Sequence, residues 1–144
     1  MAVTIHFATQ SDRDLILTSQ DLFDDAPRAE WVDVFLADPR HHMALAVEGS
    51  TCLGFLSALD YVHPDKPPQM WINELGVVET RRREGIATAL IDATLKEARL
   101  RQCSELWVLA DPTPEALGFY ASLNAQREGS HIAMFTFDLT GPAR

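Results

Sequence analysis

The sequence predicts a mixed α/β fold with the element order β-α-α-β-β-β-α-β-α-β, in one sheet that is mostly antiparallel. Two observations predict it. Several short segments alternate apolar and polar residues, as half-buried strands do, and one long segment after Arg82 repeats its apolar residues at helical intervals. At 144 residues and 47% apolar content, the chain has the size and composition of one soluble domain, so we expect a single domain over residues 1–144.

The first half of the chain is expected to hold a strand, two short helices and a hairpin. These elements are predicted at residues 3–7, 14–23, 28–36, 43–47 and 51–59. Three prolines between His63 and Pro68 leave few backbone donors, so this stretch is predicted to be a loop. Met70 to Val78 is then the next strand.

The second half is expected to begin with the main helix. From Arg82 onward, Ile86, Leu90 and Ile91 belong to an apolar stripe at helical spacing. A short apolar strand, a helix opened by prolines and a final alternating strand are predicted at residues 106–110, 115–123 and 131–139.

Charge is distributed unevenly along the chain. The formal net charge is -9, yet residues 81–101 hold six basic and three acidic residues, a local excess of +3. An acidic protein disfavours nucleic acid as a partner and favours a cationic small molecule or basic peptide, whereas a local basic segment suits a phosphate-bearing ligand. The basic segment is equally compatible with a solvated helix face.

Other classes of protein find little support in the sequence. No segment has the order of a signal peptide or the length of a membrane span, so we expect a cytoplasmic protein that does not bind membranes. Cys52 and Cys103 have no metal-ligand spacing and are interpreted as free structural thiols. His41 and His42 are adjacent in a strand, which points them to opposite faces, so no metal site is expected.

The segment from Val78 to Ala87 has the features of an anion site. A strand ends at Val78, arginines follow, and Gly85 and Ala87 open the long helix. The first N–H groups of a helix lack intrahelical partners and point, with the positive end of the helix dipole, toward one place. Small residues there allow a diphosphate to approach the backbone. Neither a P-loop nor a dinucleotide fingerprint is present.

These residues resemble a motif of the GNAT superfamily of N-acetyltransferases. That motif has Arg or Gln, then Gly three residues later and Gly or Ala two residues after that, which Arg82, Gly85 and Ala87 match. The element order also resembles that of the superfamily, and Ala116, Phe119 and Tyr120 resemble its late helix motif. The Phe23-Asp24-Asp25 run, the 63–66 loop and the 82–90 run look most like the aminoglycoside 3-N-acetyltransferase branch.

The resemblance implies a GNAT fold with a splayed central strand pair and acetyl-coenzyme A (acetyl-CoA) as co-substrate, without a metal. It implies that the pantetheine arm pairs with the backbone of one strand and that the diphosphate is held at the helix start. The residues so implied are Leu75, Gly76, Val77, Val78, Arg82, Arg83, Glu84, Gly85, Ile86, Ala87, Thr88, Thr113 and Tyr120. Thr113 stands where the superfamily often has Asn. The strand bulge typical of the superfamily is expected at Gly76.

The resemblance also implies two catalytic residues. Glu74 corresponds to the acidic residue that acts as general base in many relatives, directly or through water, and Tyr120 aligns with the general-acid tyrosine. The developing oxyanion is expected to meet the main-chain N–H of about Val77. Apart from the resemblance, Glu74 is equally an ion-paired strand residue, and a tyrosine in an apolar helix is more often a core residue.

The acceptor is expected to be a cationic amine held by acidic groups. The candidates are Asp24, Asp25, Glu74 and Asp111, with Asp138 as a further one. The resemblance favours an aminoglycoside or similar polyamine acetylated by direct attack in a ternary complex. A protein N-terminus, a lysine or a metabolite amine remains an alternative, as does a non-catalytic CoA-binding module, and Asp24 and Asp25 equally suit a turn before Pro27. The residues do not determine the oligomeric state; a homodimer is common among relatives.

Overall fold

The computed structural model describes residues 2–141 and divides the chain into two compact units, Met1–Leu109 and Ala110–Arg144. The first unit holds all five strands, in the sheet order β1-β2-β3-β4-β5. The first three pairings are antiparallel and only β4 and β5 run parallel, which confirms the predicted mixed, mostly antiparallel sheet. The prediction of one domain over residues 1–144 stays a prediction.

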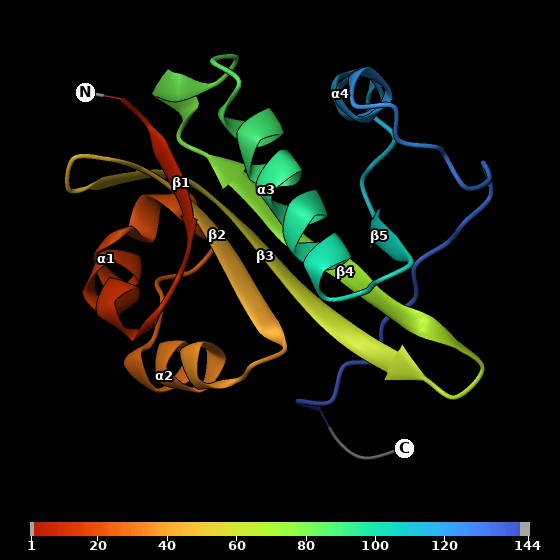
Figure 1. Cartoon of the computed structure of the whole chain (residues 1–144), viewed down its shortest axis with the longest axis horizontal. Coiled ribbons are helices and arrows are strands. Elements are labelled where there is room, and N and C mark those ends of the chain that lie inside the picture. Colours follow the sequence, from red (N-terminus) through yellow and green to blue (C-terminus); the bar gives the residue numbers. More distant parts are fainter. Residues whose placement is uncertain (1, 142–144) are drawn as a thin grey trace. The chain divides into compact units, whose positions relative to one another are not determined.

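The elements of the first unit follow the predicted order (Figure 1). They are β1 (Thr4–Phe7), the 3-10 turn η1 (Gln10–Asp12), α1 (Arg13–Thr18), η2 (Gln20–Leu22), α2 (Ala29–Ala37), β2 (His41–Glu48), β3 (Thr51–His63), β4 (Lys66–Val77), η3 (Glu79–Arg81), α3 (Ile86–Leu100) and β5 (Glu105–Val108). Within residues 2–141, no helix is both long and apolar enough to cross a membrane.

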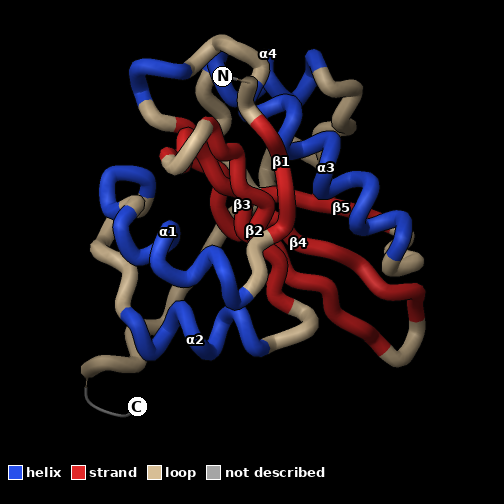
Figure 2. Tube along the Cα trace, turned by 60° about the vertical axis from the view of Figure 1, so that its left-hand side comes forward, coloured by secondary structure: helices blue, strands red, loops and turns tan. Residues whose placement is uncertain are grey.

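Helices cover both faces of the sheet. Figure 2 shows α1 and α2 on one side of the strands and α3 on the other. The first face buries Met43, Leu45 and Phe55 against Ile16 and Val32. Burial of one such side chain contributes about 1.5–3 kcal/mol, so this cluster fixes α1 and α2 on the sheet.

The α3 face uses the alternate strand residues. Ala44, Leu56 and Met70 have no exposed surface, and neither has Leu90 on the helix. Thr94 is also fully buried, and its hydroxyl donates to the Leu90 carbonyl at 2.8 Å, which satisfies the one polar group on this helix stripe. The predicted stripe of α3 is therefore its buried face.

The predicted loop at His63 to Pro68 is wrong in its second half, because β4 begins at Lys66. His63 pairs with Lys66 and Tyr61 pairs with Gln69, and the register shifts between these pairs. Pro67 and Pro68 therefore lie where no ladder partner is required. A proline that lacks an N–H is tolerated at such an irregularity.

The second unit contains α4 (Pro114–Ser122) and an irregular segment after it. Thr113 caps the helix by accepting from the Ala116 N–H at 3.2 Å, and Asn124, just after the helix, has a left-handed conformation with φ 61°.

The predicted final strand at 131–139 is wrong, since these residues form no strand in the structure. Ile132, Met134, Phe135, Phe137 and Leu139 alternate as expected, but all are strongly exposed. A strand needs a partner to satisfy its backbone groups, and the described part of this unit contains no other strand. Alternation alone does not supply that partner.

Candidate active site

An open strand edge lies at the centre of the first unit. β5 pairs with β4 only from Gln69 to Ile72, while β4 continues to Val77. The Val78 N–H donates to the Leu53 carbonyl of β3 at 2.8 Å, and backbone groups alternate between the two edges of a strand, so those of Leu75 and Val77 face away from β3. The Arg82 Nε donates to the Val77 carbonyl at 3.3 Å, which agrees with that orientation.

The backbone groups of Leu75, Val77 and Val78 are not equally available for the predicted pantetheine contacts. Leu75 and Val77 have N–H and C=O groups on the open edge. Val78 has its N–H bonded to Leu53, and its carbonyl accepts from the Arg81 N–H at 3.0 Å. Val78 therefore has no free N–H to offer a ligand.

The irregularity of β4 lies at Asn73 and not at Gly76, where we expected it. Ser57 pairs with Glu74 but Ala58 pairs with Ile72, so Asn73 is the extra residue. Gly76 pairs regularly with Phe55. It is needed for another reason: a Cβ at Gly76 would lie 2.9 Å from the Phe55 ring and 3.3 Å from the Leu22 carbonyl oxygen.

The loop between β4 and α3 exposes the helix N-terminus. Helix α3 begins at Ile86, where Gly85 and Ala87 were expected to open it, and Gly85, with φ 82°, ends the preceding loop. No side chain caps the helix, and the Ala89 N–H is the first to reach an acceptor, the Gly85 carbonyl at 3.0 Å. The N–H groups of residues 86–88 are thus available to an anion.

An ion pair that the sequence did not predict fixes this loop. Arg81 donates to both carboxylate oxygens of Glu48 at 3.1 and 3.3 Å and to Glu84 at 2.7 Å. The Arg81 guanidinium lowers the pKa of the Glu48 carboxyl, although partial burial opposes it. The predicted role of Glu84 can therefore involve only its backbone, since its side chain is held by Arg81.

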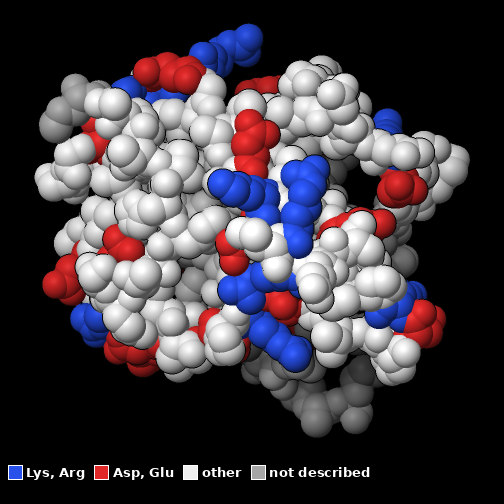
Figure 3. Space-filling view, viewed as in Figure 1, with Lys and Arg blue, Asp and Glu red and all other residues white. Residues whose placement is uncertain are grey.

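The basic segment is not a continuous positive patch. Besides Arg81, Arg101 pairs with Glu97 at 2.9 Å. On the face shown in Figure 3, Lys and Arg side chains lie beside Asp and Glu side chains. Arg82 and Arg83 are exposed at the start of α3 and remain the cations closest in sequence to its free N–H groups.

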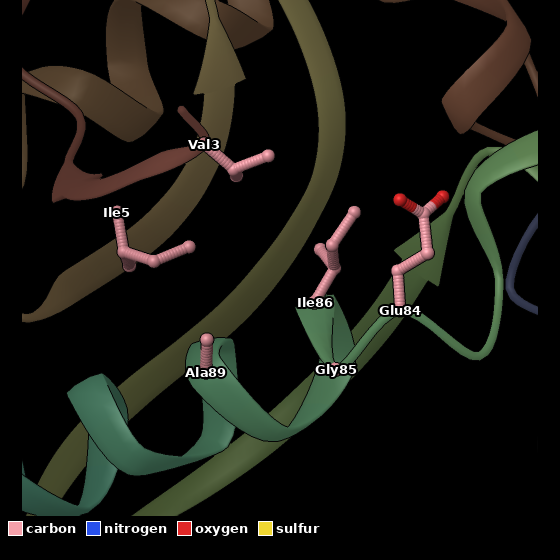
Figure 4. A pocket seen from close by; sticks show the side chains of 6 residues that line it. All are labelled: Val3, Ile5, Glu84, Gly85, Ile86 and Ala89. Carbon is pink, nitrogen blue, oxygen red and sulfur yellow. The ribbon is translucent and has the colours of Figure 1, made fainter. Parts of the chain in front are cut away.

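A cavity of about 140 Å³ lies between β1 and the first turn of α3 (Figure 4). Val3, Ile5, Ile86 and Ala89 make most of its wall apolar. Sites for nucleotide-sized ligands usually exceed about 300 Å³. This cavity is therefore too small to hold a whole nucleotide-sized ligand.

A second, larger cavity of about 420 Å³ brings together three of the predicted acceptor residues. Asp24 and Asp25, from the segment between η2 and α2, line it together with Glu74 of β4. All three are exposed side chains. Its floor is apolar and includes Ile16, Phe23, Val32, Phe35 and Met43.

Two further residues of this cavity were missed by the sequence analysis. Trp31 is 63% exposed on α2, and the guanidinium carbon of Arg28 lies 4.3 Å from its ring centroid. Arg28 also pairs with Glu30. Trp31 precedes Val32 and stands one helical turn before Phe35, and a large aromatic residue at the edge of this apolar face was the signal available in the sequence.

The remaining predicted residues, Thr113, Asp111 and Tyr120, belong to the second unit. Thr113 acts as a helix cap, and Asp111 is exposed, its carbonyl accepting from the Thr113 N–H at 2.8 Å. Burial raises the pKa of the Tyr120 hydroxyl, which stays protonated at neutral pH. Among the described residues, no group of three or more His, Cys, Asp or Glu is placed to hold a metal ion.

The chain matches the sequence profile of a family described as the acetyltransferase (GNAT) family over residues 9–125. This match covers most of the chain and includes both the open edge of β4 and the start of α3. The chain therefore belongs to the GNAT acetyltransferase family. It is an acetyl-CoA-dependent N-acetyltransferase, and the predicted superfamily and co-substrate are confirmed.

Solved structures share this fold at low sequence identity. An aminoglycoside acetyltransferase from an uncultured soil metagenomic sample, in complex with sisomicin, is 22% identical, with 95% of this chain and 96% of that chain covered and a TM-score of 0.86. A ribosomal-protein-alanine N-acetyltransferase from Brucella melitensis biovar Abortus 2308 is 21% identical, with coverages of 95% and 100% and a TM-score of 0.74. The aminoglycoside N-acetyltransferase AAC(6')-Iy, in complex with CoA, is 17% identical, with coverages of 94% and 95% and a TM-score of 0.79. Comparison with curated protein sequences gave no match.

Proposed function

We propose that this protein transfers the acetyl group of acetyl-CoA directly to a primary amine of an aminoglycoside or similar polyamine. The observation that carries the proposal is the 420 Å³ cavity, which joins Asp24 and Asp25 to Glu74. Three carboxylates on one cavity attract and orient a cationic acceptor. The aminoglycoside acetyltransferases of the same fold support this acceptor class.

The donor would bind along β4 and at the start of α3. Leu75 and Val77 offer backbone groups on the open edge for the pantetheine arm, as the orientation of the Val78 N–H implies. The free N–H groups of residues 86–88, with Arg82 and Arg83, would hold the diphosphate. Gly85 keeps side-chain bulk away from this approach.

Glu74 would accept the proton that makes the amine nucleophilic. A primary ammonium has a pKa near 10 and cannot attack a thioester until it loses a proton. Glu74 is exposed on the cavity that holds Asp24 and Asp25, so the base and the groups that position the ammonium lie on one surface. The amine nitrogen then bonds to the acetyl carbon, and the Val77 N–H on the open edge is the expected donor to the oxyanion.

Tyr120 would complete the reaction as a general acid. When the carbon–sulfur bond breaks, the CoA thiolate takes the hydroxyl proton of Tyr120. The second proton of the attacking nitrogen passes to water, from which Tyr120 regains its proton, and the products are the N-acetylated amine and free CoA thiol. The raised pKa of Tyr120 keeps that proton available at neutral pH. Asp111 is proposed as a further acceptor contact, and a cytoplasmic location and a homodimer stay predictions.

A turnover screen tests the proposal. The protein is incubated with acetyl-CoA and, separately, neamine, spermidine, a lysine peptide and a peptide with an N-terminal alanine, and thiol release is followed. We expect neamine or spermidine to give the highest kcat/KM. Preference for either peptide would replace the acceptor with a protein amine, and CoA binding without any turnover would mark a non-catalytic CoA-binding module.

A further inference from the structure

We propose that Trp31 selects acceptors whose amine is carried on a ring, in preference to linear polyamines. The inference rests on the proposed function, because it treats the cavity lined by Asp24, Asp25 and Glu74 as the acceptor site. It goes beyond the proposed function because it specifies a ring-shaped acceptor and the side chain that distinguishes it from a linear one.

The composition of the cavity is the first argument. Eight of its twelve lining residues are apolar, and the acidic groups are limited to the three carboxylates. A linear polyamine spaces ammonium groups along its whole length, and those placed against Val32, Phe35 or Met43 would lose hydration without gaining a partner. An amine on a ring instead presents its charge at one side and C–H surface at the other.

The exposure of Trp31 is the second argument. An indole that is 63% exposed on a cavity wall leaves a large apolar surface in water. Arg28 lies over the ring at 4.3 Å, so one of the two ring faces is covered. The exposed part of the ring offers a flat surface on which the C–H face of a sugar ring or an aromatic ring can lie.

The charge of Arg28 does not oppose a cationic acceptor. Arg28 pairs with Glu30 on the first turn of α2, so its charge is compensated outside the cavity lining. Asp24, Asp25 and Glu74 then leave the cavity net negative. An ammonium directed toward these carboxylates and a ring directed toward Trp31 use both parts of the wall.

The test compares a ring amine with a linear amine in matched variants. Steady-state acetylation of neamine and of spermidine is measured for the unaltered protein, Trp31→Ala, Trp31→Phe and the control Val34→Ala, which alters an exposed α2 residue outside the cavity. Trp31→Ala should raise KM for neamine roughly two- to tenfold, the effect of one aromatic contact, with kcat nearly unchanged. Spermidine KM should stay the same, Trp31→Phe should restore most of the neamine affinity, and Val34→Ala should have no effect.

Two results would overturn the inference. An equal rise in KM for spermidine would give Trp31 a role unrelated to rings, and an unchanged KM for neamine would remove it from the acceptor site. If the unaltered protein acetylates neither amine, the proposed function fails, and calorimetric binding of neamine decides the inference separately. Neamine binding that weakens in Trp31→Ala supports it, whereas undetectable binding to the unaltered protein ends it.

Discussion

Substitutions of Gly85, at the start of α3, should affect the stability of the protein and its binding of CoA by different amounts. The Gly85 φ of 82° is in the left-handed region, and a Cβ there would meet no atom within 4 Å. A Cβ at this position therefore meets no steric obstacle in the protein. It would nevertheless occupy the space through which we propose that a diphosphate approaches the free N–H groups.

Gly85→Val and Gly85→Asn should differ in the stability that they lose but not in the CoA affinity that they lose. The left-handed conformation costs most residues about 1–2 kcal/mol, while Asn tolerates it better. With a urea m-value of about 1–3 kcal/mol/M, Gly85→Val should lower the unfolding midpoint by roughly 0.3–2 M, and Gly85→Asn by less. Losing two charge-assisted hydrogen bonds, at about 1.5–3 kcal/mol each, should weaken CoA binding about 100-fold or more in both variants.

Urea unfolding and calorimetric CoA titration measure the two effects. Gly129→Val is the matched control, because Gly129 also has a positive φ of 76°, with only Ile132 near the position of its Cβ, and has no proposed binding role. We expect the control to bind CoA normally. If Gly85→Asn is folded and retains its CoA affinity, the phosphate site has been placed at the wrong turn.

Three other substitutions test the remaining roles. Glu74→Gln should lower kcat/KM about 100-fold or more, mainly below the pKa of the amine, with CoA affinity unchanged; a pH-rate profile that keeps its shape would exclude Glu74 as the base. Tyr120→Phe should reduce kcat while KM for acetyl-CoA is retained, and a normal kcat would remove Tyr120 as the acid. Arg81→Ala should destabilise the protein at neutral pH. Because Arg81 lowers the pKa of Glu48 in the folded protein, the ion pair stabilises the fold fully above the ordinary glutamate pKa. This stabilisation is lost as the pH falls through the lowered pKa of Glu48. In acid titrations, the difference in unfolding free energy between the variant and the parent protein should therefore disappear below that pKa.

Most of the fold was predictable because its elements have strong local patterns. The stripe of Ile86, Leu90 and Ile91 is buried along α3, and the two largely apolar runs at 43–47 and 51–59, separated by the turn at 48–50, gave the β2–β3 hairpin. The secondary-structure predictions were wrong where the conformation of a segment depends on pairing with another strand. The 131–139 segment alternates but has no strand beside it in its own unit, and Pro67 and Pro68 are tolerated because the register shift leaves them unpaired.

The geometry of the candidate site follows most directly from the sequence where it depends on the backbone. Gly85 at the helix start and the open edge at Leu75 and Val77 follow from local sequence and the order of strands. Side-chain partners over long distances in sequence were not predictable. Arg81 reaches Glu48, which is 33 residues away, and Trp31 lines the same cavity as Glu74 only because α2 packs on the sheet.

The extra residue Asn73 explains how β4 can present both a buried face and an acidic group. Side chains alternate along a strand, so Met70, Ile72 and Glu74 would share one face in a regular β4, and that face is buried against α3. A shift of one residue moves every later side chain to the opposite face. After the shift, Glu74 lies on the face covered by α1 and α2 and lines the cavity with Asp24. The irregularity therefore places the proposed base at the acceptor cavity and, by the same step, leaves the backbone of β4 beyond it unpaired on the β5 side, where the thioester would lie.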